Sequence, residues 1–209
     1  MFLTFEGIEG CGKTTQIKRL GGWLEKSGVQ VTLTREPGGS HIGEPLRKIL
    51  LSREYSIAPL TELLLYVSDR AEHLEKIIRP ALARGDWVLC DRYGDATRAY
   101  QAFGRNIRRE IVEQAHALAT SGLEPDLTLF LRMSPETAVE RARRRNNREE
   151  SSEDKFEAEA LAFHRRVAAG YGALAEEFPG RIAAVDAEGT PDEVFARILS
   201  VLESRHVLE

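Results

Sequence analysis

Cysteine is scarce in this chain, and so are other features that would assign it to several classes of protein. Its 209 residues include two cysteines, Cys11 and Cys90, which are too few for a disulfide framework and are typical of a reducing compartment. No apolar stretch is long enough to span a membrane, and no charged-then-apolar leader begins the sequence. A formal net charge of −4 gives no overall basic surface for nucleic acids or anionic lipids. We therefore expect a cytoplasmic protein that binds neither nucleic acid nor a membrane.

Linkers and internal repeats are absent as well. Hydrophobic residues make up 42% of the chain, which at this length is enough for one well-packed core. We therefore expect a single domain over residues 1–209.

Five short apolar runs alternate with longer segments of helical periodicity. The runs lack polar residues at alternate positions, as strands do when helices cover both faces of a sheet. They span residues 2–5, 29–34, 87–90, 127–131 and 182–185. We predict an α/β fold with a five-stranded parallel sheet flanked by helices on both faces. Ligands of such sheets gather at the carboxyl ends of the strands, so the residues that directly follow the runs are expected to line one functional edge.

The phosphate-loop pattern G-x-x-x-x-G-K-[ST] is complete directly after the first apolar run, in Gly7-Ile8-Glu9-Gly10-Cys11-Gly12-Lys13-Thr14. Glycines let successive N–H groups point at phosphate oxygens, and the following helix adds its positive end. Lys13 is placed to reach the β- and γ-phosphates, and the Thr14 hydroxyl to hold Mg²⁺. A chance glycine turn is the alternative. The pattern, with a strand before it and a helix after it, predicts a site for a nucleoside triphosphate.

Asp91 and Arg92 follow the third apolar run, where phosphate-loop proteins place a second carboxylate for the Mg²⁺ shell. A carboxylate organises a metal ion, whereas a guanidinium fork clamps a phosphate. The alternative is that Asp91 caps the next turn and pairs with Arg92. Given the phosphate loop, we interpret the two residues as a sign that two phosphates meet here.

Three further arginines, Arg35, Arg47 and Arg70, follow or flank the same predicted edge. Arg35 leads directly into the turn of residues 36–39, and turn and charge together make an anion pocket. Each arginine alone is compatible with an ordinary surface position, but several around a triphosphate indicate a second anionic substrate. The sequence therefore favours a transferase over a hydrolase.

The helical segment between the second and third runs is apolar over more of its circumference than one core contact requires. Its apolar positions are Leu60, Leu63, Leu64, Val67, Ala71, Leu74, Ile78 and Leu82, with Leu65, Ile77 and Ala81 on the other face. Burial in a subunit interface and burial by the chain's own helices both explain this pattern.

Residues 140–155 are nearly all charged or polar and cannot fold around a core of their own. Such a run is commonly a solvated helix end and loop. Beside a phosphate loop, an arginine-rich segment also has the composition of a lid that closes over a triphosphate. We predict a short arginine-rich lid at about residues 143–155.

Cys11 lies inside the phosphate loop at a helix N-terminus, a position that lowers the pKa of a thiol. Most such cysteines are merely small residues that fit the loop. The alternative hypothesis is a reactive thiol, which a thiol reagent would modify and MgATP would protect.

Five segments in order resemble the bacterial thymidylate kinase (dTMP kinase) family of P-loop nucleoside monophosphate kinases, and the resemblance runs from end to end. They read FEGIEGCGKTT at 5–15, TREPGG at 34–39, SDRA at 68–71, CDRY at 90–93 continuing to AYQ at 99–101, and PDLTL at 125–129. The resemblance implies Mg²⁺-dependent transfer of the ATP γ-phosphoryl group to dTMP, giving dTDP and ADP for dTTP synthesis. It also implies a homodimer, and it extends the ATP-binding loop over Gly7, Ile8, Glu9, Gly10, Cys11, Gly12, Lys13, Thr14 and Thr15.

The resemblance also implies roles in dTMP binding. Tyr66 would stack under thymine where the family usually has Phe, and Arg70 would donate to a thymine carbonyl. Thr97 and Gln101 would complete the base contacts. Tyr100 would crowd the sugar 2′ position and so favour deoxyribose. A flat aromatic face suits a base in the same way as guanidinium forks suit a phosphate.

On the phosphate side, the resemblance implies that Arg35, Arg47 and Arg92 cradle the 5′-phosphate, with Glu9 near the sugar and the acceptor phosphate. Lys13, Mg²⁺ and Arg92 would neutralise the transferring group, with Thr14 and Asp91 at the metal. No general base is required, because the acceptor phosphate is already an anion.

In this family the catalytic arginine comes from the phosphate loop or from the lid. Because Gly10 occupies the loop position, the resemblance implies a lid arginine, with Arg148 as the first choice and Arg143 or Arg145 next. Three residues depart from the family pattern. Lys155 stands where an arginine is common, Ala96 where a serine is common, and Arg132 where an acidic residue is common.

Two other interpretations stay open. One is another nucleoside or nucleotide kinase with a different base preference. The other is a P-loop nucleotide switch or ATPase, although the chain has no Asn-Lys-x-Asp guanine-reading run and an acceptor pocket has no purpose in a switch. Dependence of ADP formation on an added nucleoside monophosphate separates a transferase from a switch.

Overall fold

A parallel sheet of five strands forms the centre of the protein. The structure, a computed structural model, describes residues 1–149 and 159–208, and for residue 143 and residues 145–149 it describes the backbone only. The strands are β1 (Phe2–Glu6), β2 (Val31–Arg35), β3 (Trp87–Asp91), β4 (Leu127–Arg132) and β5 (Ile182–Asp186), in the order β2-β3-β1-β4-β5. All pair in parallel, and Leu3 in β1 stands opposite Leu89 of β3 and Leu127 of β4. The predicted fold class is therefore confirmed.

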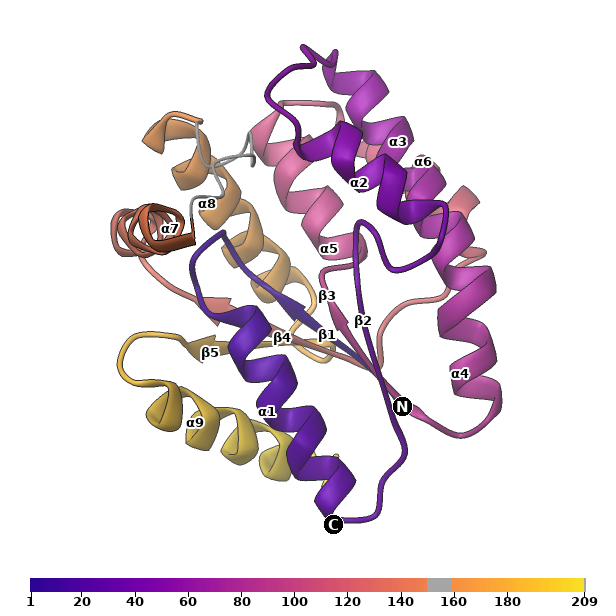
Figure 1. The fold of residues 1–209 in the computed structure, drawn as a ribbon, viewed down its shortest axis with the longest axis vertical. Coiled ribbons are helices and arrows are strands. Elements are labelled where there is room, and N and C mark those ends of the chain that lie inside the picture. Colours follow the sequence, from indigo (N-terminus) through magenta and orange to yellow (C-terminus); the bar gives the residue numbers. More distant parts are fainter. Residues whose placement is uncertain (150–158, 209) are drawn as a thin grey trace.

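Helices cover both faces of this sheet. In chain order they are α1 (Lys13–Lys26), α2 (Gly43–Leu51), α3 (Pro59–His73), the π-helical turn η1 (Leu74–Ile78), α4 (Arg79–Ala83), α5 (Gly94–Thr97), the π-helical segment η2 (Arg98–Gly104), α6 (Arg109–Thr120), α7 (Pro135–Glu149), α8 (Leu161–Glu177) and α9 (Pro191–Ser204). Figure 1 shows α1 and α9 side by side in front of the sheet, with α5 and α8 behind it. Strands covered in this way read as continuous apolar runs, which is why the sequence pattern located them.

The central strands are buried on both faces, and two of their polar side chains satisfy each other within the sheet. Every residue of β1 is buried. Thr4 and Thr128, on neighbouring strands, share a buried hydrogen bond of 2.8 Å between their hydroxyls. Pairing of this kind removes the cost of burying a lone hydroxyl. The strands therefore form a rigid platform for the loops at their carboxyl ends.

The long apolar segment before β3 is helical throughout, as predicted, but a π-helical turn divides it into α3 and α4. The turn η1 ends two residues before Pro80, whose nitrogen has no hydrogen to donate, so the regular hydrogen-bond ladder cannot continue there. Leu63 and Ile78 are fully buried against the chain's own core, whereas Leu60 and Leu64 are each 53% exposed. Packing within the chain thus accounts for one face of the segment and leaves the other face uncovered.

Candidate active site

The phosphate loop joins β1 to α1, and its backbone requires glycine. Gly7, Gly10 and Gly12 have positive φ angles of 139°, 84° and 97°, which L side chains rarely adopt. A side chain at Gly10 would also place its Cβ 2.2 Å from the carbonyl oxygen of Ala138 in α7. No arginine fits at position 10, so this loop does not supply a catalytic arginine from that position.

Lys13, the first residue of α1, turns back over the loop. Its Nζ donates to the carbonyl oxygens of residues 7 and 8, at 3.2 and 3.1 Å, and the side chain is buried. Burial and the charge of Arg92 lower the pKa of Lys13, but nearby acidic groups, Glu9 and Asp91 among them, raise it to a net value above that of an ordinary lysine. The ammonium group is therefore charged and already held where phosphate oxygens would lie.

Thr14 and Asp91 bring two oxygen ligands together at the start of α1. The Thr14 hydroxyl donates to Asp91 Oδ2 at 3.1 Å. Within residues 1–149 and 159–208, no group of three or more His, Cys, Asp and Glu side chains is arranged to hold a metal ion. Mg²⁺ commonly takes only one or two protein oxygens and completes its shell with phosphate oxygens and water. The residues present therefore fit a magnesium ion that arrives with a nucleoside triphosphate.

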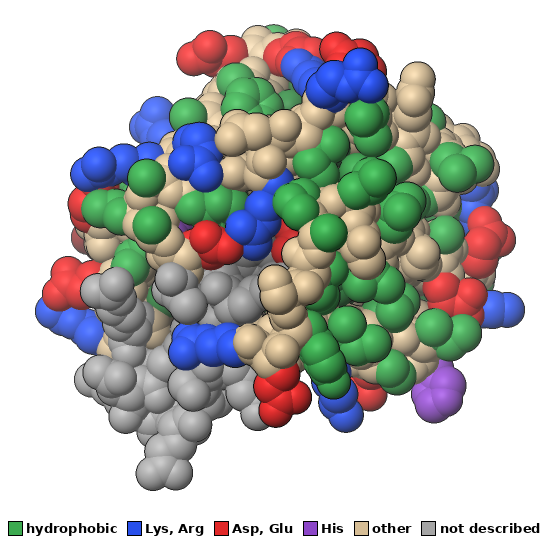
Figure 2. Space-filling view, turned by 90° about the horizontal axis from the view of Figure 1, so that it is seen from above, with side chains coloured by type: hydrophobic (Ala, Val, Ile, Leu, Met, Phe, Trp, Pro, Cys, Tyr) green, Lys and Arg blue, Asp and Glu red, His purple; other side chains and the backbone are tan. Residues whose placement is uncertain are grey.

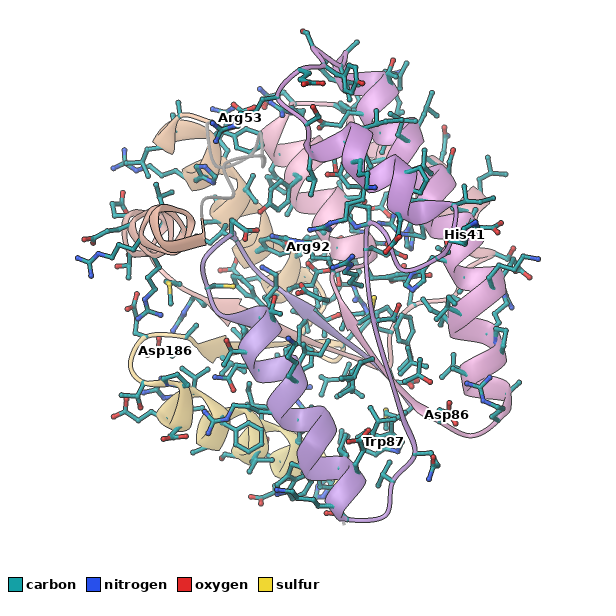
Figure 3. The ribbon with its side chains drawn as sticks, in the orientation of Figure 1. His41, Arg53, Asp86, Trp87, Arg92 and Asp186 are labelled. Atoms are coloured by element: carbon teal, nitrogen blue, oxygen red, sulfur yellow. The ribbon has the colours of Figure 1, made fainter. Side chains whose placement is uncertain are left out.

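Arg92 is held by four hydrogen-bond partners. It follows β3 in a left-handed backbone conformation, with φ at 75°, which is rare for a residue with a side chain and persists when its surroundings hold it. One guanidinium nitrogen donates to Gly7 O at 2.9 Å and to the Tyr171 hydroxyl at 3.2 Å. The other donates to Glu9 Oε2 and to the Tyr100 hydroxyl, both at 3.2 Å. Figure 3 shows Arg92 near the centre of the molecule, and these contacts fix it there before any ligand binds.

The charge of Arg92 is also protected. Burial alone lowers the pKa of its guanidinium, but Tyr100, Tyr171 and the carboxylate of Glu9 keep that pKa well above the ordinary arginine value. The guanidinium carbon lies 4.9 Å from the centre of the Tyr100 ring, a cation–π distance. Arg92 is therefore a preorganised positive charge aimed along the edge of the sheet.

Two hollows open at the carboxyl ends of the strands. The larger has a volume of about 1270 Å³, which includes space open to solvent, and lies against the phosphate loop and the start of α1. The smaller has a volume of about 530 Å³ measured in the same way and lies between α3 and the segment from Tyr93 to Gln101. Four side chains line both hollows: Glu9, Glu36, Arg47 and Arg92. Two ligands would thus meet at a boundary that carries two arginines, which suits the contact between two phosphates.

The smaller hollow is also lined by all five residues predicted to surround a nucleoside: Tyr66, Arg70, Thr97, Tyr100 and Gln101. With Tyr93, the hollow combines three aromatic rings with guanidinium and short polar groups, the composition of a small-molecule site. The structure brings these predicted residues together, and their individual roles stay predictions.

Arg70 is buried at 1% exposure and held on several sides. Its Nε donates to Glu36 at 2.8 Å, and one terminal nitrogen donates to Tyr93 O at 3.0 Å and to Thr97 Oγ1 at 2.7 Å. The second oxygen of Glu36 lies 2.9 Å from His73 Nδ1. Burial raises the pKa of Glu36, but Arg70 and His73 lower it to a net value below the usual range. A buried ion pair thus fixes the guanidinium at the wall of the hollow.

Arg35 and Arg47 differ in which of the two hollows they line. Arg47, in α2, donates to Pro37 O at 3.0 Å and lines both hollows. Arg35 ends β2, is exposed, and is found only at the larger hollow. The structure therefore places Arg47 and Arg92, but not Arg35, along the smaller hollow.

Sequence reasoning missed two residues beneath Arg92. Glu6 is fully buried at the end of β1, and burial and Asp95 raise its pKa to about 7. One of its oxygens accepts the Tyr93 N–H at 2.7 Å, and the other accepts the Tyr171 hydroxyl at 2.7 Å. Tyr171 thus links Glu6 to Arg92. The acidic residue at the end of a strand was a usable signal for Glu6, but nothing in the sequence points from Arg92 to a tyrosine 79 residues away.

The predicted direction of the Cys11 pKa shift was wrong, and the interpretation of Cys11 as a small residue that fits the loop is favoured. Its side chain is 3% exposed, and burial raises the pKa of the thiol above its ordinary value even though Lys13 and Arg92 lower it. Desolvation disfavours the thiolate more than the positive loop favours it. Cys11 is therefore a small residue that fits the loop.

The predicted lid lies partly outside the described residues. Helix α7 ends at Glu149, and the side chains of Arg143, Arg145 and Arg148, like all of Lys155, are not described. Of the other departures from the family pattern, Ala96 lines the smaller hollow, and Arg132 is exposed at the end of β4. None of the described helices is long and apolar enough to cross a membrane.

One hollow lies at a phosphate loop, and a second hollow shares two arginines with it. Together they define a P-loop kinase that acts on a second phosphorylated substrate. The family model described as "Thymidylate kinase" matches residues 5–198. The chain belongs to the thymidylate kinase family.

Individual relatives agree with this assignment. The chain is 50% identical over 198 residues to the thymidylate kinase of Gloeobacter violaceus, covering 93% of this chain and 92% of the relative. It is 49% identical over 207 residues to that of Trichlorobacter lovleyi, covering 98% of each. The crystal structure of thymidylate kinase from Ehrlichia chaffeensis superposes with a TM-score of 0.77 at 32% identity, covering 97% of this chain and 98% of the other.

Proposed function

We propose that this chain transfers the γ-phosphoryl group of ATP to dTMP, giving dTDP and ADP for dTTP synthesis, from one kinase domain over residues 1–209. The observation that carries this proposal is the pair of adjoining hollows, one at the phosphate loop and one with the composition of a nucleoside site, joined at Arg47 and Arg92. ATP fits the larger hollow and dTMP the smaller. Membership of the thymidylate kinase family supports this choice of substrates.

The reaction needs positioning and charge neutralisation more than covalent chemistry. Lys13 holds phosphate oxygens of the donor, and Arg92 lies where the donor and acceptor phosphates meet. Glu9 accepts a hydrogen bond from Arg92, which keeps the guanidinium turned toward that boundary. Because the acceptor phosphate is already an anion, the chain does not have to remove a proton from it.

Thr14 and Asp91 are proposed to hold Mg²⁺ together with phosphate oxygens of ATP. When bound, the ion would neutralise charge on the donor phosphates. We expect ADP formation to stop on addition of a chelator and to return with Mg²⁺. Mass spectrometry should show that the chain is intact before and after the treatment.

The catalytic arginine that closes the site is proposed to come from the lid, with Arg148 first and Arg143 or Arg145 next. Position 10 admits no side chain, which removes the competing source in the loop. Arg148→Ala is expected to lower kcat by about 10³-fold, because an arginine at the transferring group acts mainly in the transition state. Steady-state kinetics should show a KM for dTMP within about threefold of wild type. An unchanged kcat would move the role to another lid arginine.

Arg70→Ala tests the assignment of the base end of the smaller hollow. Its guanidinium is proposed to donate to a thymine carbonyl, so the substitution is expected to raise the KM for dTMP by about 10- to 100-fold, with the KM for ATP little changed. Initial rates with each substrate varied in turn provide the measurement. Equal increases in both KM values would place Arg70 in general stability and not in base binding.

A homodimer is proposed from the uncovered apolar face of α3. Leu60 and Leu64 are each 53% exposed, and Leu118 of the neighbouring α6 is 84% exposed. Figure 2 shows hydrophobic side chains gathered over one half of the face seen there. Exposed apolar surface of this kind is typical of a subunit interface. Sedimentation equilibrium tests the proposal, with twice the chain mass expected.

The function itself is tested by following ADP release with MgATP and a panel of dTMP, dUMP, dCMP, dGMP, dAMP and UMP, with a control that lacks an acceptor. We expect a strong preference for dTMP and no release without an acceptor. Release that is independent of the acceptor would indicate an ATPase or a switch. Preference for another monophosphate would retain the kinase but overturn the proposed substrate.

A further inference from the structure

Glu62 is a buried carboxylate that the reaction described above does not use. It lies in the first turn of α3 and is 1% exposed. Positions 62, 66 and 70 are one helical turn apart, so Glu62 shares a face of α3 with Tyr66 and Arg70, both of which line the smaller hollow. A carboxylate is costly to bury without hydrogen-bond partners. The side chains that donate hydrogen bonds to Glu62 are therefore the ones it can hold in position.

Gln101 is one of those partners. Its Nε2 donates to Glu62 Oε1 at 2.9 Å, and its side chain lines the smaller hollow while only 1% of the residue is exposed. Arg105 donates to the same carboxylate, with its Nε 3.2 Å from Oε1, so donors from two residues converge on Glu62.

The contact fixes the direction of the Gln101 carboxamide. An ionised carboxylate only accepts hydrogen bonds, so the NH₂ end of the carboxamide must face Glu62 and the carbonyl end must face away. In the part of the chain that the structure describes, no protein group donates to Gln101 Oε1. Because Gln101 lies in the part of the smaller hollow that is not shared with the ATP side, that carbonyl is available to a base and not to a phosphate.

We propose that Glu62 is a specificity-determining residue, which acts by holding the Gln101 carbonyl toward the hollow as an acceptor for a base with an N–H donor at ring position 3. Thymine has such a donor. Cytosine has a lone pair at the same position, which would face the carbonyl oxygen without a hydrogen bond. A site built for a donor rejects an acceptor because its own buried group is then left unpaired. The proposal rests on the function proposed above, and it concerns a residue that does not itself line the hollow.

The test is Glu62→Gln, measured with two nucleotides that keep the same ring methyl. A carboxamide at position 62 can donate as well as accept, so Gln101 becomes free to turn over. The KM for dTMP is compared with the inhibition constant of 5-methyl-dCMP as a competitor of dTMP phosphorylation. We expect the ratio of these constants, 5-methyl-dCMP over dTMP, to fall by about tenfold or more in Glu62→Gln. The two nucleotides also differ at ring position 4. That difference is the same in every variant, so it cancels when the ratios of the variants are compared.

Glu159→Gln is the matched control. Glu159 is the other carboxylate on Arg105, at 2.5 Å from its NH1, and the structure gives it no hydrogen bond to Gln101. Its replacement removes the same kind of charge from the same arginine, and the ratio is expected to stay within about twofold of wild type. Gln101→Met provides the second comparison, because it removes the carbonyl and is expected to lower the ratio by itself. In that background Glu62→Gln should have no further effect on the ratio.

A ratio unchanged in Glu62→Gln would overturn the proposal, and so would an equal change with and without Gln101. A purely structural role of Glu62 would weaken both nucleotides alike and leave the ratio constant. If thermal unfolding shows that Glu62→Gln does not fold, Gln101→Met decides alone, and an unchanged ratio there overturns the proposal. Failure of the wild-type protein to phosphorylate dTMP would overturn the proposed function instead, before any variant is compared.

Discussion

Lys13→Ala is expected to lower kcat by about 10³-fold or more while the protein stays folded and still binds dTMP. The side chain is buried and charged, and it already lies over the phosphate loop, within 3.2 Å of two loop carbonyls. Its charge would act on the donor phosphates, whose negative charge the reaction redistributes, so its loss falls mainly on the transition state. A loss of this size corresponds to about 4 kcal/mol of transition-state stabilisation. Single-turnover kinetics at saturating ATP provide the measurement.

Lys18→Ala is the control for Lys13→Ala, because Lys18 is an exposed lysine one turn further along α1. It should retain wild-type kcat and thermal stability, since an exposed charge of this kind contributes little. Titration calorimetry with dTMP should give similar affinities for wild type and Lys13→Ala. If Lys13→Ala retains more than a tenth of wild-type kcat, the assignment of Lys13 to the donor phosphates is wrong.

The fold could be predicted because its signals are local. Each apolar run became a strand, and all five strands extend one residue beyond the predicted end. The last residues are polar groups that stand where the strands meet the ligand edge: Glu6, Arg35, Asp91, Arg132 and Asp186. The apolar pattern stops at the ligand edge, so it marks the edge of the site as well as the end of the strand.

The π-helical turn before Pro80 and the buried state of Cys11 could not be predicted in the same way. A proline inside an apolar helix predicts an interruption but not its form, because the surrounding packing decides how the free carbonyls are satisfied.

For Cys11, the local pattern gave the electrostatic effect of the helix end and the loop cations. It gave no measure of burial, which proved to be the larger effect on the pKa.

Contacts between distant segments account for most of what the sequence concealed in the site. Glu62 holds Gln101 across 39 residues, and Tyr171 contacts Arg92 across 79. Glu62 and Tyr171 stand within the helices α3 and α8, and neither belongs to a local sequence motif. In contrast, the residues proposed to contact phosphate are held by glycine turns and strand ends, which leave a readable pattern. The sequence therefore offers candidates for ligand contact, but it does not show which residues orient them.

Arg92→Ala is expected to lower kcat by about 10³-fold and to raise the KM for dTMP by about tenfold. The two effects have separate origins. Arg92 lines the smaller hollow, where it would bind the acceptor phosphate in the ground state, and it also lines the boundary with the larger hollow, where charge develops as the phosphoryl group moves. Steady-state kinetics over both substrates provide the measurement. A rise in KM without loss of kcat would restrict Arg92 to binding.

Tyr171→Phe separates the position of Arg92 from its charge. The substitution removes the hydroxyl that accepts from Arg92 at 3.2 Å and donates to Glu6 at 2.7 Å, but it leaves the guanidinium and its contacts with Glu9 and Tyr100. If the fixed direction of the guanidinium matters, kcat should fall by about 10-fold, with the KM for ATP unchanged. The alternative is that charge alone is sufficient, and then Tyr171→Phe and wild type should have the same kcat. We expect the fall in kcat, because the surroundings of Arg92 hold its backbone in a rare conformation. A guanidinium that acted through its charge alone would not need to be held in this way.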